Sequence, residues 1–258
     1  MSADLVSLLA TLRRERRQQS GLDPRLVPTD NDAAYRIAGE VAATLGWVVA
    51  GWKIAAAKPA MQRALRTNAP IYGRVFAPFV VASPFETPRA PLLHPLVEPE
   101  YVARLGVDLP PRAKPYPQEE VAEAVETLQP AVEIAECRFV HDAAFPPLSA
   151  ILADGAASGT IVLGAPIADW RERDIPGQEV AMRVNGVERR RGTAREALDH
   201  PLVPLTWLAN ELSRTGVGLK AGQIVSTGTL TGMVLAKPHE EYVVDYGPFG
   251  SVAVRFGA

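Results

Sequence analysis

The chain has 258 residues, of which 47% are hydrophobic and 22% are charged, and its formal net charge is −2. This composition is typical of a folded globular protein, and no apolar run approaches the length of about 18 residues that spans a bilayer, so we expect no membrane partner. The weak net charge predicts no nucleic-acid partner. A single cysteine, Cys137, excludes an internal disulfide and fits a reducing compartment, so we expect the protein in the cytoplasm.

The first part of the chain is predicted to be helical. Leucines at helical spacing indicate a helix over residues 3–19. A second amphipathic helix begins after a cap at Asp30 or Asn31 and ends at Gly46.

The next segment is predicted to lead from this helical part to a larger domain. Residues 47–57 are apolar and β-branched enough for a buried strand, and Pro59–Leu65 predicts a short helix. The proline-rich span Pro78–Pro95 is typical of an irregular connection or an edge strand. We therefore divide the chain into a mainly helical region, residues 1–85, and a larger β-rich domain, residues 86–258.

Short strands outnumber helices in the larger domain. Helices are predicted over residues 118–129 and 201–216. Strands are predicted over residues 96–106, 131–139 and 159–164, in a hairpin around Asn185-Gly186, and in the last 35 or so residues. This order indicates an α+β fold rather than regular βαβ alternation. No dinucleotide fingerprint, P-loop or GxSxG motif is present, so nucleotide binding and serine-esterase chemistry are poorly supported.

Three glutamates in predicted strands are candidate metal ligands. Glu98 and Glu100 lie two residues apart in "LVEPEYVARLG", so both side chains share one face of a strand. Glu133 lies in the strand "PAVEIAECRFV". Carboxylates with substrate oxygens form an all-oxygen set that suits Mg²⁺ or Mn²⁺. The alternative is that all three are surface charges paired with arginines, since spacing alone does not bring Glu133 to the other two.

Lys53 is a lone ammonium group amid apolar residues, and a buried lysine can act as a proton donor or acceptor. If it is an acid-base group beside a bound metal, its pKa should lie well below the ordinary value of about 10.4, because the cation and partial desolvation both disfavour the ammonium form. The alternative is a lysine whose head reaches the surface from a half-exposed strand.

Two turns of small residues are candidate substrate-binding segments. Asp154 and Ser158 lie in "ILADGAASGTIVLG", where backbone N–H groups could approach an anion. Thr227 and Gly228 lie in "STGTLTG", where glycines allow close approach of a ligand. Ordinary tight turns have the same composition, so both readings stay open.

Several segments together resemble the 2-keto-4-pentenoate hydratase branch of the fumarylacetoacetate hydrolase superfamily. They are "GWKIAAAKPAMQRALRTNAPIYGRVF", "VEPEYVARLGVDLPP", "PYPQEEVAEAVETLQPAVEIAECRF", "LADGAASGTIVLG" and "WLANELSRTGVGLKAGQIVSTGTLTG". They occur in the order of the family over about residues 30–256. The last segment, with "AGQIV" and "TGT", is quite specific, whereas the two neighbouring glutamates alone would not be.

The resemblance implies a metal-dependent lyase and assigns roles to the candidate residues. Mg²⁺ or Mn²⁺ would be held by Glu98, Glu100 and Glu133, and Lys53 would be the acid-base group. The implied reaction adds water to a 2-hydroxy-2,4-dienoate of the 2-oxopent-4-enoate type, giving a 4-hydroxy-2-oxo acid in aromatic or related catabolism. The implied assembly is a homo-oligomer, which could associate with a partner enzyme of the same pathway.

Three positions depart from the pattern of the family. Relatives usually carry glycine where this chain has Ala55, often an acidic residue in the segment of Pro78, and asparagine where this chain has Gly155. These departures leave the glutamates intact but leave the reaction open. Decarboxylation of a 4-oxalocrotonate-type acid, hydrolysis of an acylpyruvate C–C bond, and a non-catalytic partner subunit are the alternatives.

Overall fold

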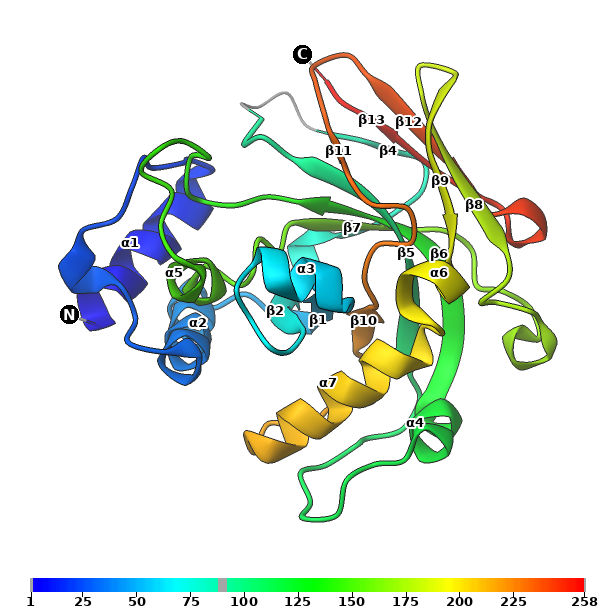
Figure 1. Cartoon of the computed structure of the whole chain (residues 1–258), viewed down its shortest axis with the longest axis horizontal. Coiled ribbons are helices and arrows are strands. Elements are labelled where there is room, and N and C mark those ends of the chain that lie inside the picture. The colour runs from blue at the N-terminus through cyan, green and yellow to red at the C-terminus, as the bar shows by residue number, and fades with distance from the viewer. Residues whose placement is uncertain (1, 88–91, 258) are drawn as a thin grey trace.

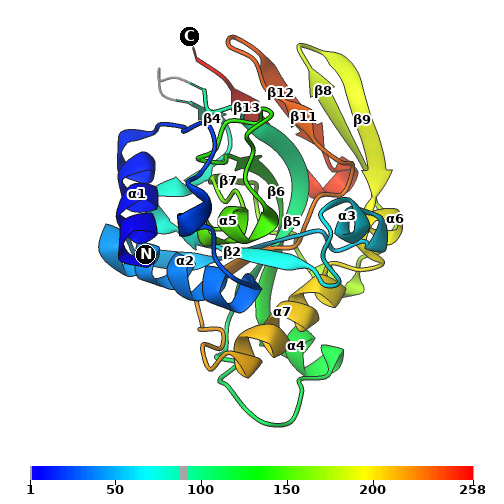
Figure 2. The ribbon, with the colours of Figure 1, turned by 60° about the vertical axis from the view of Figure 1, so that its left-hand side comes forward.

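The helical part of the protein lies to one side of a β-rich remainder in the computed structural model, which describes residues 2–87 and 92–257 (Figure 1). Helix α1 (Ser2–Glu15) packs against α2 (Asn31–Leu45), and α2 also contacts α5 (Leu148–Ala153) (Figure 2). The predicted α+β fold, with a helical N-terminal part before a β-rich domain, is confirmed. None of the helices in these two described stretches is long and apolar enough to cross a bilayer.

Helix α2 begins and ends at the predicted residues. The carboxylate of Asp30 accepts a hydrogen bond from the Ala33 N–H at 2.7 Å, which satisfies one of the free donors of the first turn. Gly46 ends the helix in the left-handed conformation, with φ of 67°. The first helix is shorter than predicted, because it ends at Glu15 and not at residue 19.

The main sheet has eight strands and curls round on itself. Its order is β2-β1-β10-β5-β6-β7-β3, and β11 also pairs with β5. The strands are β1 (Val49–Ala55), β2 (Ile71–Phe76), β3 (Val80–Ala82), β5 (Leu96–Leu105), β6 (Val125–Ala135), β7 (Thr160–Leu163), β10 (Ile224–Ser226) and β11 (Val234–Leu235). Only the 3₁₀ turn η2 (Ala77–Phe79) joins β2 to β3, although these strands stand at opposite ends of the order. The sheet must therefore roll up, and Figure 1 shows the curvature of β5 and β6.

A second sheet of five strands covers part of the outer surface of this roll. Its order is β4-β13-β12-β8-β9, and β13 contacts β6 and β7. The strands are β4 (Phe85–Glu86), β8 (Glu179–Val184), β9 (Val187–Thr193), β12 (Glu241–Asp245) and β13 (Ser251–Arg255). The predicted hairpin is confirmed, since Asn185 and Gly186 form its turn with φ of 49° and 79°.

Helices cover another part of the outer surface. Helix α7 (Leu202–Arg214) contacts β1 and also α4 (Gln118–Ala124). Two short helices, α3 (Pro59–Ala64) and α6 (Ala194–Leu198), complete the set in the described parts of the chain, together with the 3₁₀ turns η1 (Pro24–Leu26), η3 (Trp170–Glu172) and η4 (Gly247–Phe249). The short helix predicted after the first strand is confirmed as α3.

One predicted helix is partly wrong. Residues 118–129 were expected to be helical throughout, but α4 ends at Ala124 and β6 begins at Val125. In the structure Thr127 and Leu128 pair with β5, opposite Arg104 and Ala103. Pairing with a neighbouring strand therefore outweighs the helical spacing of the apolar residues. It also adds residues to the start of β6.

The division of the chain at residue 85 stays a prediction. Strands β1, β2, β3 and β4 come from residues 49–86 and pair within the two sheets, so this stretch contributes directly to the β-rich part. Within the proline-rich span predicted as irregular or edge strand, β3 and β4 do stand at the ends of their sheets. Residues 88–91 of that span lie outside the described residues.

Candidate metal centre

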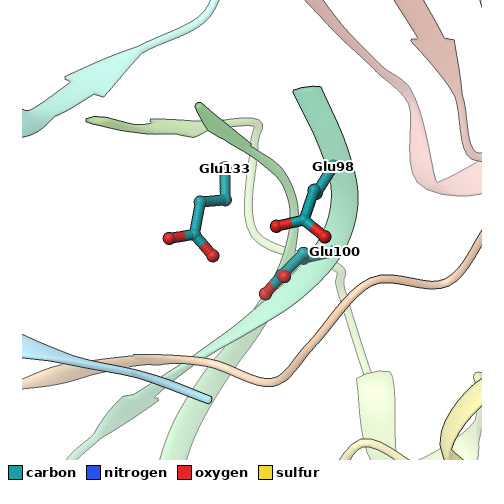
Figure 3. A group of neighbouring side chains, drawn as sticks. All are labelled: Glu98, Glu100 and Glu133. Atoms are coloured by element: carbon teal, nitrogen blue, oxygen red, sulfur yellow. The ribbon is translucent and has the colours of Figure 1, made fainter. Parts of the chain in front are cut away.

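The rolled sheet brings three glutamates together on its inner face. Glu98 and Glu100 share one face of β5, and Glu98 lies directly opposite Glu133 of β6. One carboxylate oxygen from each residue lies within 4.8 Å of the other two. Figure 3 shows the carboxylates of Glu98 and Glu100 projecting to the side on which that of Glu133 lies. All three are buried, with 8%, 1% and 0% exposure in chain order.

Lys53 supplies a positive charge at this cluster. It lies on β1 opposite Ser226 of β10, which itself lies opposite Val102 of β5, so the register places the lysine on the same face as the glutamates. Its ammonium Nζ is 3.4 Å from Oε1 of Glu133, and its side chain is 2% exposed. Lys53 is therefore a buried lysine, and the alternative of a surface-reaching head group is wrong.

The cluster holds more negative than positive charge, and the pKa values respond to this imbalance. Burial raises the pKa of Glu98 to about 7, and the charge of Glu133 adds to this rise. Burial and the neighbouring carboxylates hold the pKa of Glu100 well above its ordinary value. Burial also raises the pKa of Glu133, although Lys53 partly opposes this. Without a further cation, these carboxylates are poorly stabilised as anions.

Without a bound cation the pKa of Lys53 is raised, so the decrease predicted beside a cation stays a prediction. Burial alone lowers the pKa of the ammonium group, but the charges of Glu133, Glu98 and Glu100 raise it further than burial lowers it. The predicted decrease assumed a cation next to Lys53. The carboxylates by themselves have the opposite effect.

The residues present fit a divalent cation. Within the described parts of the chain, neither carboxylate oxygen of Glu133 accepts a hydrogen bond, although both are buried. An unsatisfied buried anion is costly, and a cation bound between the carboxylates removes that cost. The donors are all oxygens, which favours a hard cation such as Mg²⁺, Mn²⁺ or Ca²⁺ over zinc or copper.

Glu100 is held at its backbone and side chain by Tyr246 and Ser226, which were not predicted as site residues, and by Gly228, which was. The hydroxyl of Tyr246 accepts a hydrogen bond from the Glu100 N–H at 3.1 Å and donates to the carbonyl of Ala131, which lies opposite on β6. The hydroxyl of Ser226 donates to Glu100 Oε2 at 2.5 Å, and the Gly228 N–H donates to the same oxygen at 2.8 Å. Ser226 begins the "STGTLTG" motif, whereas no local sequence signal marks Tyr246.

The four predicted substrate-binding residues fall into two groups. Gly228 contacts the cluster through its N–H. The N–H and hydroxyl of Thr227 both donate to the carbonyl of Tyr101, at 3.1 and 2.9 Å. The turn after β10 is therefore hydrogen-bonded to β5 through both Thr227 and Gly228. A role of Thr227 and Gly228 in substrate binding stays a prediction.

Asp154 and Ser158 belong to a second buried network, which joins α1 to the end of β6. The carboxylate of Asp154 lies 3.1 Å from Nε of Arg138 and 3.4 Å from Nε of Arg13. The hydroxyl of Ser158 donates to the carbonyl of Arg74 at 2.8 Å. Their side chains are thus engaged in holding elements together, and their predicted role in substrate binding also stays a prediction.

This second network surrounds one of the positions that depart from the family pattern. Gly155 has φ of 83°, which disfavours other residues, and a Cβ placed there would lie 3.0 Å from Nη2 of Arg13. The Gly155 carbonyl also takes the space that a side chain at Gly73 would need, since a Cβ placed on Gly73 would lie only 2.0 Å from the Gly155 carbonyl oxygen. Gly73 lies opposite Lys53, so the Gly155 turn covers the inner face beside the lysine.

Comparison with known proteins identifies the family. Residues 55–256 match the family described as fumarylacetoacetate (FAA) hydrolase C-terminal. The chain is 30% identical over 256 residues to 2-keto-4-pentenoate hydratase 2 of Dechloromonas aromatica (strain RCB), with 97% of this chain and 95% of that protein covered. It is 29% identical over 252 residues to 2-oxo-hept-4-ene-1,7-dioate hydratase of Escherichia coli, with 96% and 94% covered.

A solved structure agrees with this likeness in fold. The 4-oxalocrotonate decarboxylase from Pseudomonas putida G7, complexed with magnesium and adipate, superimposes with a TM-score of 0.90 at 24% identity, covering 99% of this chain and 97% of that one. The family match and the hydratase relatives show that the chain is an enzyme of the fumarylacetoacetate hydrolase superfamily. It belongs to the fumarylacetoacetate hydrolase family, as its sequence motifs predict.

The raised pKa of Glu98 predicts a pH dependence of stability in the metal-free protein. The pKa rises from 4.5 to about 7 on folding, so between these values the folded state binds more protons than the unfolded chain. In EDTA, the free energy of unfolding should therefore fall as pH rises from about 4.5 to 7, by up to about 3 kcal/mol from this residue. Urea unfolding at pH 5, 6 and 7 measures it.

Glu98→Gln is the matched variant for that measurement. It should show a shallower fall, because glutamine does not titrate. The comparison also removes the opposing contribution of His200, whose pKa burial lowers, since that residue is present in both proteins. Equal slopes for the two proteins would contradict the assignment of this pH dependence to Glu98.

Proposed function

We propose that the protein is a Mg²⁺- or Mn²⁺-dependent hydro-lyase. Its substrate would be a 2-hydroxy-2,4-dienoate of the 2-oxopent-4-enoate type and its product a 4-hydroxy-2-oxo acid, in aromatic or related catabolism. The observation that carries this proposal is the buried group of Glu98, Glu100 and Glu133 with Lys53 on one face of the sheet. Two hydratases that match this chain over nearly their whole length support the choice of reaction.

The three glutamates would hold the cation, each through carboxylate oxygens. When bound, Mg²⁺ or Mn²⁺ supplies positive charge beside the carboxylate and 2-oxo oxygens of the substrate, where negative charge develops during the reaction. The glutamates would also fix the cation to one place, since all three project from two paired strands.

Lys53 would transfer protons at its Nζ atom. Hydration of the dienoate removes the proton of the 2-hydroxyl group and adds one at carbon 5, after which the oxygen of water adds at carbon 4 and a proton adds at carbon 3. A group that both accepts and donates protons is therefore needed beside carbons 3 to 5. In the described parts of the chain, Lys53 is the cationic side chain in ion-pair contact with the cluster, and its head group already lies 3.4 Å from Glu133.

A decarboxylase of 4-oxalocrotonate-type acids is the second candidate. The fold superimposes with a TM-score of 0.90 on that of a decarboxylase complexed with magnesium and adipate. Loss of CO₂ from such an acid also places negative charge on the 2-oxo oxygen, so the same cluster would serve it. An acylpyruvate-type C–C hydrolase shares this requirement. A non-catalytic subunit is less well supported, because Lys53 and all three glutamates are present and assembled.

Several expectations about the setting of the protein stay predictions. They are assembly into a homo-oligomer, association with a partner enzyme of the same pathway, and a place in the cytoplasm. A small 2-oxo or 2-hydroxy-dienoic acid as the partner molecule follows from the proposed reaction.

A product assay tests the proposed reaction. The purified chain would be assayed with Mg²⁺, with Mn²⁺ and with excess EDTA against 2-hydroxypenta-2,4-dienoate, 2-oxo-3-hexenedioate and an acylpyruvate. We expect the first substrate to give a 4-hydroxy-2-oxo acid in the presence of metal, with activity lost in EDTA and restored by adding metal back. Release of CO₂ or C–C cleavage as the main reaction would replace the hydratase assignment, and full turnover in EDTA would contradict metal dependence.

Replacing Lys53 with methionine tests its role in proton transfer. Methionine keeps a long apolar stem but has no ionisable group, so kcat should fall by at least about a hundredfold. Mn²⁺ affinity should not decrease, because a positive charge is removed beside the ligands. Cys137→Ala is the control, and its kcat should stay within about threefold of wild type. Turnover of Lys53→Met at the wild-type rate would show that Lys53 is only structural.

A further inference from the structure

Ser226 directs its hydroxyl group at a predicted metal ligand rather than at the backbone. The side chain is fully buried, and its Oγ lies 2.5 Å from Oε2 of Glu100. Ser20 and Thr29 also donate to carboxylates, but both are exposed residues. The hydroxyl of Thr227 instead donates to the carbonyl of Tyr101 at 2.9 Å, and that of Ser149 to the carbonyl of Pro28 at 3.0 Å. A hydroxyl bound to a carboxylate forms a shorter and stronger hydrogen bond than one bound to a carbonyl.

The strand register explains why Ser226 reaches Glu100. Ser226 of β10 lies opposite Val102 of β5, and Glu100 is two residues from Val102 on the same face. The chain then turns at Gly228, whose φ of 108° is open to glycine but strained for other residues. This turn brings the Gly228 N–H to 2.8 Å from the same Oε2 atom.

The two donors make the oxygens of Glu100 unequal. Oε2 accepts both hydrogen bonds, whereas Oε1 accepts none from the residues that the structure describes. A carboxylate held in this way can neither rotate freely nor present both oxygens equally to a cation. The other two glutamates differ, since no hydrogen bond to the carboxylate of Glu98 or Glu133 is found in the same residues.

We propose that Ser226 is a positioning residue of the metal centre, whose hydroxyl, together with the Gly228 N–H, holds Oε2 of Glu100 so that Oε1 faces the cation. This inference rests on the proposed function, because it assumes that the three glutamates bind a divalent ion. It adds that Glu100 acts as a pre-oriented ligand through one oxygen, while Glu98 and Glu133 adjust to the ion. Hydrogen bonds of this kind orient metal ligands and contribute to metal affinity.

Mn²⁺ binding without substrate tests the inference independently of catalysis. Free Mn²⁺ would be measured by electron paramagnetic resonance during titration of wild type, Ser226→Ala, Ser226→Thr and the control Ser149→Ala. Ser226→Ala should raise the Kd for Mn²⁺ about 10- to 100-fold. Ser226→Thr keeps a hydroxyl and should stay within about threefold of wild type, as should Ser149→Ala, which removes a hydroxyl bound to a backbone carbonyl away from the glutamates.

Each outcome has a distinct meaning. If wild type binds no Mn²⁺, the proposed function fails and the role of Ser226 fails with it. If wild type binds Mn²⁺ and folded Ser226→Ala binds it within about twofold of wild type, the role of Ser226 alone is overturned. If Ser226→Ala does not fold, Ser226→Cys replaces it, since a thiol of similar size is a weaker donor, and an unchanged Kd overturns the inference in the same way.

A split of the kinetic constants separates positioning from a general loss of structure. At saturating Mn²⁺, Ser226→Ala should recover most of its kcat, because the ion is then bound and only its affinity is weakened. A kcat that stays low at saturating Mn²⁺, with an unchanged Kd for the ion, would assign Ser226 to another role and overturn the inference.

Discussion

Burial of three carboxylates beside a single ammonium group is the constraint on which this structure depends. Glu98, Glu100 and Glu133 are at most 8% exposed, and Lys53 balances only one of them. Such a cluster is unfavourable in an apolar interior unless its members take up protons or bind a cation. The raised pKa values of the glutamates and the unsatisfied oxygens of Glu133 express the same imbalance. Under the proposed function, a divalent cation would resolve this imbalance and would also supply the charge that the reaction needs.

Both sheets take part in holding this unfavourable arrangement. The curl of the main sheet turns its inner face into an enclosed site, and pairing of β5 with β6 sets Glu98 opposite Glu133. Pro99 has no N–H between the two neighbouring glutamates, and Tyr246 from the second sheet bridges the backbones of Glu100 and Ala131 there. The turn after β10 then fixes the side chain of Glu100. Residues distant in sequence thus hold both the backbone and the side chain of Glu100.

The sequence predicted the parts of this site that depend on local geometry. Glu98 and Glu100 share a face because strand side chains alternate, and the caps of α2 follow from Asp30 and Gly46. Glu133 lies beside these two glutamates because of the register between β5 and β6, which the spacing of residues within one strand does not predict. The helix expected over residues 118–129 ends at Ala124, because the residues from Val125 onward belong to β6, which pairs with β5. The contacts of Ser226 and Tyr246, the partners of Asp154 and the direction of the Lys53 pKa depend on neighbours distant in sequence, so spacing could not reveal them.

The most direct test of this account is to locate the cation itself. Crystals grown with Mn²⁺ would be measured at the manganese absorption edge, where anomalous scattering identifies the ion without reference to activity. The account predicts one strong anomalous peak on the inner face of the main sheet, about 2.0–2.6 Å from one oxygen each of Glu98, Glu100 and Glu133. No peak at these residues, in crystals whose solution contains saturating Mn²⁺, would contradict it.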